Sequence, residues 1–244
     1  MYSQSIVDIK TFIEGYRAFN HRFEAQHWQH DQLAYTKLLT GWRVMQTMAA
    51  HIERHTAADY NVFYVMKNMG ASEVKLHSPF LADLLNVKGQ HKQGDLFYRE
   101  FIKLLGLPES KYLPKDTYWF DVQTEAASGT GGIDILITYN SGVEKFAIAI
   151  ENKIYAGDQE RQLERYHEYL VREYGHDFTL VYLTIDGRKP SYFSASREFL
   201  STNSIPCISY RLHIEEMLRN TTPLISPPHV RFIIQQYLQV CQDL

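Results

Sequence analysis

Two apolar runs of strand length, residues 133–139 and 145–154, contain charged residues and constrain the fold more than any other feature. The link "NSG" between them is typical of an antiparallel hairpin, because Asn and Gly tolerate the backbone angles of tight turns. Side chains alternate along a strand, so Glu151 and Lys153 should share one face. If the two strands pair, Asp134 can join them there. The sequence therefore predicts three charged groups converging on one side of a buried hairpin.

The chemistry of such a cluster favours a divalent cation. Ala147 and Ala149 share the face of Glu151 and leave room above it. A buried pair of carboxylates, Asp134 and Glu151, is costly unless a cation neutralises it. Carboxylate and carbonyl oxygens suit Mg²⁺ or Mn²⁺, and a nearby lysine can orient water or stabilise charge on phosphorus. This combination predicts phosphodiester hydrolysis, whereas the alternative is an edge-strand salt bridge near solvent.

The E-x-K pattern alone carries little information, because the chain contains it three times, beginning at Glu73, Glu109 and Glu151. Charged residues make up 22% of the sequence, so such triplets arise by chance. Only the third lies at the end of an apolar strand and has an aspartate, Asp134, on the strand before it.

The rest of the chain predicts an α/β fold preceded by a helical extension. Helical periodicity without proline covers residues 4 to about 55, which suggests an extension over 1–57 and a main domain over 58–244. A further helix should begin at Asp158 as its N-cap and end near Gly175, and the Ser78 hydroxyl should cap another. Further strands are expected at 117–124, 178–185 and 205–210, and further helices at 80–85, 96–105, 213–220 and 229–240.

Composition excludes several classes of protein. The 244-residue chain has a net charge of −3, which argues against a strongly basic nucleic-acid footprint. Two cysteines provide neither a disulfide framework nor a thiolate metal site. The N-terminus lacks the apolar run of a signal peptide, and no stretch approaches transmembrane length. We therefore expect a cytoplasmic protein without a membrane partner.

The segment "IENKIYAGDQERQLERY", residues 150–166, together with Asp134, resembles the PD-(D/E)XK nuclease superfamily, and in particular a bacterial branch of it. The resemblance covers roughly residues 60–244 and is strongest over 131–166. It implies a restriction-endonuclease-like mixed central sheet flanked by helices, Mg²⁺ dependence and cleavage of nucleic acid. No proline precedes Asp134, but this branch often lacks it.

The resemblance also implies roles for individual residues. Asp134, Glu151 and the backbone carbonyl of Asn152 would hold Mg²⁺ or Mn²⁺. Lys153 would position or activate the attacking water.

Supporting roles are assigned to two further residues. Gln162, near the start of the helix after the hairpin, would hydrogen-bond the water or a phosphate, with Gln159 a weaker candidate. Glu73 would complete the acidic cluster from an early helix. His77 lies four residues after Glu73 and would share its helical face near the site, and the alternative is a capping or core histidine. Tyr166 is assigned to packing.

These features predict a Mg²⁺-dependent nuclease that acts on DNA. Two alternatives remain open: a non-cleaving nucleic-acid-binding module on the same fold, and a partner-docking component of a defence or repair system. A homodimer or a protein partner would then use the N-terminal helices. Basic residues could flank a cleft, although their scatter is equally typical of a solvated surface: Lys88, His91, Lys92, Arg161, Arg165, Arg188 and Lys189.

Overall fold

The computed structural model describes residues 2–57, 60–70, 73–128 and 131–244. The chain divides into two compact units, residues 1–60 and residues 61–244, which are described separately.

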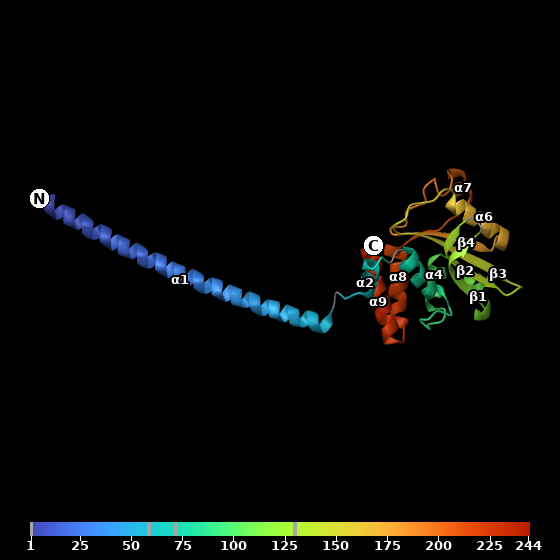
Figure 1. Cartoon of the computed structure of the whole chain (residues 1–244), viewed down its shortest axis with the longest axis horizontal. Helices are drawn as coiled ribbons and strands as arrows, with labels where there is room; N and C mark the ends of the chain where they lie inside the picture. Colours follow the sequence, from blue (N-terminus) through green and yellow to red (C-terminus); the bar gives the residue numbers. More distant parts are fainter. Residues whose placement is uncertain (1, 58–59, 71–72, 129–130) are drawn as a thin grey trace. The chain divides into compact units, whose positions relative to one another are not determined.

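The first unit is one helix, α1 (Tyr2–Thr56), which runs for 55 residues without a break (Figure 1). The helical extension expected from the sequence is therefore present as a single helix. Its glycines, Gly15 and Gly41, do not interrupt it. No helix among the described residues has the length and apolarity needed to cross a membrane.

The second unit is built on a five-stranded sheet with the strand order β1-β2-β3-β4-β5. Strands β1, β2 and β3 pair antiparallel, whereas β3, β4 and β5 pair parallel. The central strand, β3, is buried at every position except its first residue, as expected for a strand covered on both faces. The strands are β1 (Phe120–Ala127), β2 (Gly132–Asn140), β3 (Lys145–Lys153), β4 (Phe178–Thr184) and β5 (Cys207–Ser209).

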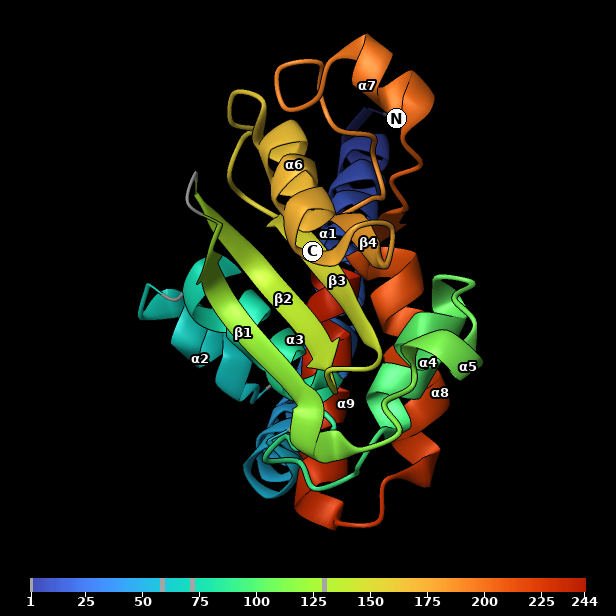
Figure 2. The ribbon, with the colours of Figure 1, turned by 90° about the vertical axis from the view of Figure 1, so that its right-hand side faces the viewer.

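Helices flank both faces of this sheet, which confirms the predicted restriction-endonuclease-like α/β architecture with a mixed sheet (Figure 2). The α-helices are α2 (Val62–Asn68), α3 (Ser78–Leu85), α4 (Leu96–Leu104), α5 (Glu109–Tyr112), α6 (Gln162–Tyr174), α7 (Arg197–Thr202), α8 (Glu215–Thr221) and α9 (Pro228–Asp243). A π-helix, η1 (Glu73–His77), leads into α3, and a second, η3 (Tyr210–Ile214), leads into α8. Single 3₁₀ turns occupy η2 (Thr117–Trp119) and η4 (Thr222–Leu224).

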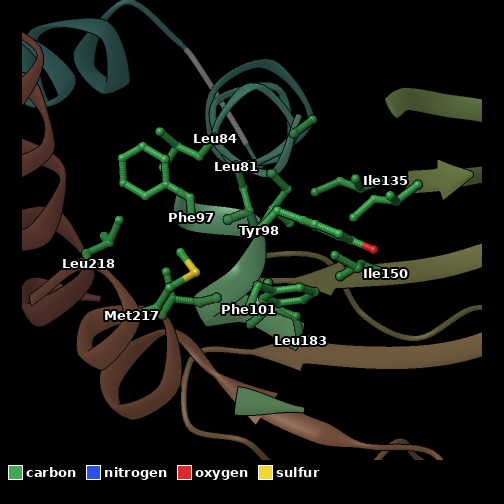
Figure 3. Packing of buried hydrophobic residues seen from close by; sticks show 14 of the residues in the cluster. Leu81, Leu84, Phe97, Tyr98, Phe101, Ile135, Ile150, Leu183, Met217 and Leu218 are labelled. Carbon is green, nitrogen blue, oxygen red and sulfur yellow. The ribbon is translucent and has the colours of Figure 1, made fainter. Parts of the chain in front are cut away.

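The two faces of the sheet belong to separate apolar clusters. On one face, Ile135, Ile150 and Leu183 pack with residues of α3, α4 and α8, as Figure 3 shows, and residues of α9 belong to the same cluster. On the other face, Ala147 and Ala149 pack with residues of α6. The predicted alternation along β3 is therefore confirmed, and the face with the small residues is the one that α6 covers.

The hairpin between β2 and β3 also follows the sequence prediction. Gly142 adopts a φ of +82°, and the Asn140 side chain accepts a hydrogen bond from its N–H at 3.0 Å. The Ser141 N–H closes the loop by donating to the carbonyl of Glu144 at 3.0 Å. These local bonds fix the register of the two strands.

The predicted start of the helix at Ser78 and Pro79 is confirmed, but two predicted caps, Asp158 and Ser78, are wrong, because tertiary contacts compete with local capping. The helix α6 begins at Gln162 rather than at Asp158, whose carboxylate accepts from the Tyr182 hydroxyl at 2.6 Å and the Ser191 N–H at 2.8 Å. The Ser78 hydroxyl accepts instead from the Asn152 side-chain amide at 3.0 Å. Because α3 continues directly from η1, no free helix end needs that hydroxyl.

Candidate metal centre

The register of β2 and β3 brings two carboxylates together. Ile135 pairs with Ile150, so the same register extended by one residue places Asp134 opposite Glu151. The side chain of Asp134 then takes the place of a ladder partner, because its Oδ2 accepts from the Asn152 N–H at 2.6 Å. N–H and C=O of one residue point to the same side of a strand, so the Asn152 carbonyl also faces Asp134.

Glu151 and Lys153 lie on the α6 face of β3 and are almost completely removed from solvent. The side chain of Glu151 is 0% exposed and that of Lys153 is 5% exposed. The Nζ of Lys153 lies 2.7 Å from Oε1 of Glu151. The pair lies on the central strand, so a salt bridge near solvent on an edge strand is excluded.

The environment of Glu151 favours its protonated form. Burial and, after it, the nearby charge of Asp134 raise the pKa of Glu151 to about 8, although the Lys153 ammonium acts in the opposite direction. A single lysine therefore does not compensate for desolvation and the second carboxylate. Without a further cation, this carboxyl group holds its proton at neutral pH.

The oxygen donors present fit a divalent cation. Both carboxylate oxygens of Glu151 are buried, and neither accepts a hydrogen bond of good geometry from the described residues. Together with Asp134 and the Asn152 carbonyl they form a hard-oxygen set, which Mg²⁺ completes with water rather than with an all-protein cage. Within the described part of the chain, no group of three or more His, Cys, Asp or Glu side chains could hold a metal.

Helix α6 adds two polar groups to this face. Gln162 is 3% exposed, and its Nε2 donates to the Tyr166 hydroxyl at 3.0 Å. Its Oε1 is buried and has no hydrogen-bond partner among the described residues. The Tyr166 hydroxyl in turn donates to the carbonyl of Gly132, at the start of β2. Gln162 thus lies at the helix start, held from one side by a tyrosine.

Tyr166, which the sequence assigned to packing, does pack in the apolar cluster with Leu163 and Leu170, and its hydroxyl also takes part in the hydrogen bonds of this face. Burial and then the charge of Glu151 raise the pKa of Tyr166 to about 12, which places its hydroxyl within electrostatic reach of the carboxylates. Residues four apart on a helix are neighbours, so the spacing of Gln162 and Tyr166 indicates that their side chains meet.

Three other candidates are not brought into this cluster by the described contacts. Gln159 is exposed in the loop before α6 rather than on the helical face of Gln162. His77 is buried, and its Nδ1 lies 3.0 Å from the hydroxyl of Tyr237, as expected for a core histidine. Glu73 begins η1, and its side chain lies outside the described part of the structure.

The raised pKa of Glu151 predicts that the metal-free protein loses stability as the pH rises. The folded state keeps this proton up to about pH 8, whereas an unfolded glutamate releases it near pH 4.5. The free energy of unfolding should therefore fall across that window, by at most about 1.4 kcal/mol per pH unit from this group. Urea unfolding in EDTA from pH 5 to pH 9 measures the slope.

Glu151→Gln is the matched variant, because it mimics the protonated side chain at nearly constant volume. Its stability should lack this slope and should equal or exceed that of the wild type above pH 8. A variant that is much less stable than the wild type at every pH would show that the contact with Lys153 is a structural ion pair.

Comparison with known proteins identifies a family for this chain. The family model of the PD-(D/E)XK nuclease superfamily matches residues 60–239. No curated protein sequence and no solved structure matched the chain.

Proposed function

Because the chain belongs to the PD-(D/E)XK nuclease superfamily, we propose that it is a divalent-metal-dependent nuclease that hydrolyses phosphodiester bonds in DNA. The observation that carries the proposal is Glu151: a fully buried carboxylate opposite Asp134, with the Lys153 ammonium 2.7 Å from its Oε1 and with no hydrogen-bond partner for its Oε2 among the described residues. In a structural ion pair, each buried carboxylate would have a cationic side chain of its own. Two carboxylates beside one lysine are the composition expected of a site that takes up a cation.

The chain supplies distinct groups to such a site. Asp134, Glu151 and the Asn152 carbonyl would hold Mg²⁺ or Mn²⁺, which when bound activates water and polarises a phosphoryl oxygen. Asp134 is already oriented by the Asn152 N–H. Lys153 lies beside Glu151 and would orient the attacking water or stabilise the charge that grows on the phosphate.

Two further side chains would support these groups. Gln162 presents its unpartnered Oε1 on the same face and would accept a hydrogen bond from the water. Tyr166 would hold the amide of Gln162 in that orientation. Glu73 remains a proposal from the sequence, as the residue that completes the acidic cluster.

Changing Lys153 to Met tests the catalytic assignment. The substitution keeps most of the aliphatic stem and removes the charge, so metal binding should survive while cleavage falls by a factor of about 100 or more. Cleavage of labelled single- and double-stranded DNA and RNA with Mg²⁺, Mn²⁺ or EDTA measures the effect.

Lys145→Met is the matched control, because Lys145 lies at the opposite, exposed end of the same strand. It should cleave like the wild type. Cleavage by Lys153→Met within threefold of the wild type would contradict the role of Lys153. Nucleic-acid binding without any product from the wild type would favour the non-cleaving alternative.

Metal binding should also be visible in stability. At about a hundred times its Kd, a native-state ligand adds roughly 2.7 kcal/mol, which for a chain of this size raises the Tm by about 5 to 10 °C. The wild type should show this rise with Mn²⁺ or Mg²⁺ relative to EDTA, and Asp134→Asn should lose most of it. If no metal shifts the wild-type Tm, the two carboxylates do not form a metal site.

We further propose that α1 associates with α1 of a second copy of the chain. Seven aromatic side chains among those described in α1 are at least half exposed: Phe12, Tyr16, Phe19, Phe23, Trp28, Tyr35 and Trp42. At about 150–250 Å² for each aromatic side chain, even half of their area approaches the roughly 800 Å² that one partner contributes to a standard interface.

The spacing in the second half of α1 supports a helical partner. Apolar residues recur there at intervals of three and four, which is the pattern of a coiled-coil seam: Tyr35, Leu38, Trp42, Met45, Ala49 and Ile52. All of them are exposed. A lone helix with such a seam gains stability by pairing with another.

Deletion of residues 1–57 separates the two proposals. The remaining chain, which forms its own compact unit, should keep its circular dichroism, its response to Mn²⁺ and its cleavage. It should become monomeric by light scattering, whereas the full chain should be at least dimeric. A monomeric full chain would contradict association through α1, and a folded truncated chain that ignores Mn²⁺ would place α1 in the metal site.

A further inference from the structure

The loop at residues 185–196, between β4 and α7, borders the candidate metal centre. It leaves β4 at Thr184, the register partner of Lys153 on β3. The Thr184 hydroxyl accepts from the Gly187 N–H at 2.8 Å, which fixes the first turn of the loop. Because β3 and β4 are parallel, the loop starts from the same end of the sheet as the site.

The far end of this loop returns to the start of α6. The N–H of Arg161 donates to the Phe193 carbonyl at 2.7 Å, and the N–H of Leu163 donates to the Ser194 carbonyl at 3.1 Å. These two bonds flank Gln162. A third bond, from the Ser191 N–H to Asp158 at 2.8 Å, ties the middle of the loop to the chain that precedes α6. The loop is therefore held at one end by β4, which pairs with β3, and at the other end by the start of α6, which carries Gln162.

Two adjacent aromatic side chains point out of this anchored backbone. Tyr192 is 63% exposed and Phe193 is 58% exposed, while the next two residues, Ser194 and Ala195, are fully buried. The guanidinium of Arg197 lies 5.0 Å from the centroid of the Tyr192 ring. Backbone hydrogen bonds hold the chain in place here, but both rings lie outside the two apolar clusters. Their apolar surface is therefore available to a ligand.

Cationic side chains accompany the rings. Arg188, Lys189 and Arg197 are exposed on the same stretch, against the carboxylates of Asp186 and Glu198. The balance from residue 185 to residue 198 is therefore +1, in a chain whose net charge is −3. An adjacent pair of exposed rings with cations before and after it in the chain suits a polyanion that carries flat aromatic groups.

We propose that Tyr192 and Phe193 form a stacking platform for unpaired nucleobases, and that Arg188, Lys189 and Arg197 contact the adjoining phosphates. The substrate would then be single-stranded nucleic acid, or a single-stranded segment of a larger one, since base faces inside a duplex are already stacked. This inference rests on the proposed nuclease function, because it assigns the class of substrate to that same site.

The test is binding of labelled oligonucleotides by the full-length protein in EDTA, followed by fluorescence anisotropy. Three probes of one sequence are used: single-stranded DNA, single-stranded RNA and blunt duplex DNA. The double variant Tyr192→Ala, Phe193→Ala should weaken single-strand binding at least about tenfold and leave duplex binding within twofold. The ratio of the Kd values for the two single-stranded probes shows whether the bases come from DNA or from RNA.

The chain offers a matched control in another adjacent aromatic pair. Tyr118 and Trp119 are 75% and 47% exposed and precede β1. That end of β1 pairs with Tyr139, at the end of the hairpin remote from Glu151. The double variant Tyr118→Ala, Trp119→Ala should bind all three probes like the wild type. The double variant Tyr192→Phe, Phe193→Trp keeps a ring at both positions and should bind single strands like the wild type, unlike the alanine variant.

Several results would overturn the platform. These are single-strand binding by the alanine variant within twofold of the wild type, an equal loss on duplex and single strand, or an equal loss in the Tyr118 and Trp119 control. A thermal melt confirms that the variant is folded. Binding in EDTA requires neither metal nor cleavage, so an inactive metal site would leave this result intact, and loss of the platform would leave metal binding intact.

Discussion

The pairing register of β2 and β3 is the constraint on which the remainder of the site depends. Glu151 is opposite Asp134 only in this register, and a slip of one residue would send Glu151 and Lys153 to the opposite face, into the cluster of Ile135 and Ile150. The hairpin loop and the alternating apolar residues both specify the same register. Asp134 adds a third determinant, because its carboxylate bonds the backbone of Asn152 where the ladder ends.

Burial then gives the three charged groups their chemical character. On an exposed edge strand, solvent would screen Glu151 from Asp134, and Lys153 would pair with it at little energetic consequence. On the central strand the same residues are removed from solvent, so desolvation and the charge of Asp134 raise the pKa of Glu151 to about 8 although Lys153 lies 2.7 Å away. The site is thus a property of strand order as much as of residue identity.

The sequence predicted the parts of the fold that depend on local periodicity. The alternation along 145–154 placed Glu151 and Lys153 on the face of the small residues, and the "NSG" turn predicted the hairpin. Prediction failed where distant groups compete with local ones: Asp158 resembles an N-cap, but Tyr182 and Ser191 occupy its carboxylate. The hydrogen bond from the Tyr166 hydroxyl to the Gly132 carbonyl was likewise unpredictable, because Gly132 is 34 residues away in the chain.

The two alanines of β3 set the width of the site. Ala147 and Ala149 are fully buried against α6, so the distance between helix and strand is determined by two methyl groups. A larger side chain at either position would push α6 away from the sheet, at a cost of roughly 1–3 kcal/mol. Gln162 and Tyr166 would move outward with it, although no polar atom had been changed. The spacing between α6 and the strand that carries Glu151 and Lys153 therefore depends on the two smallest side chains of that strand.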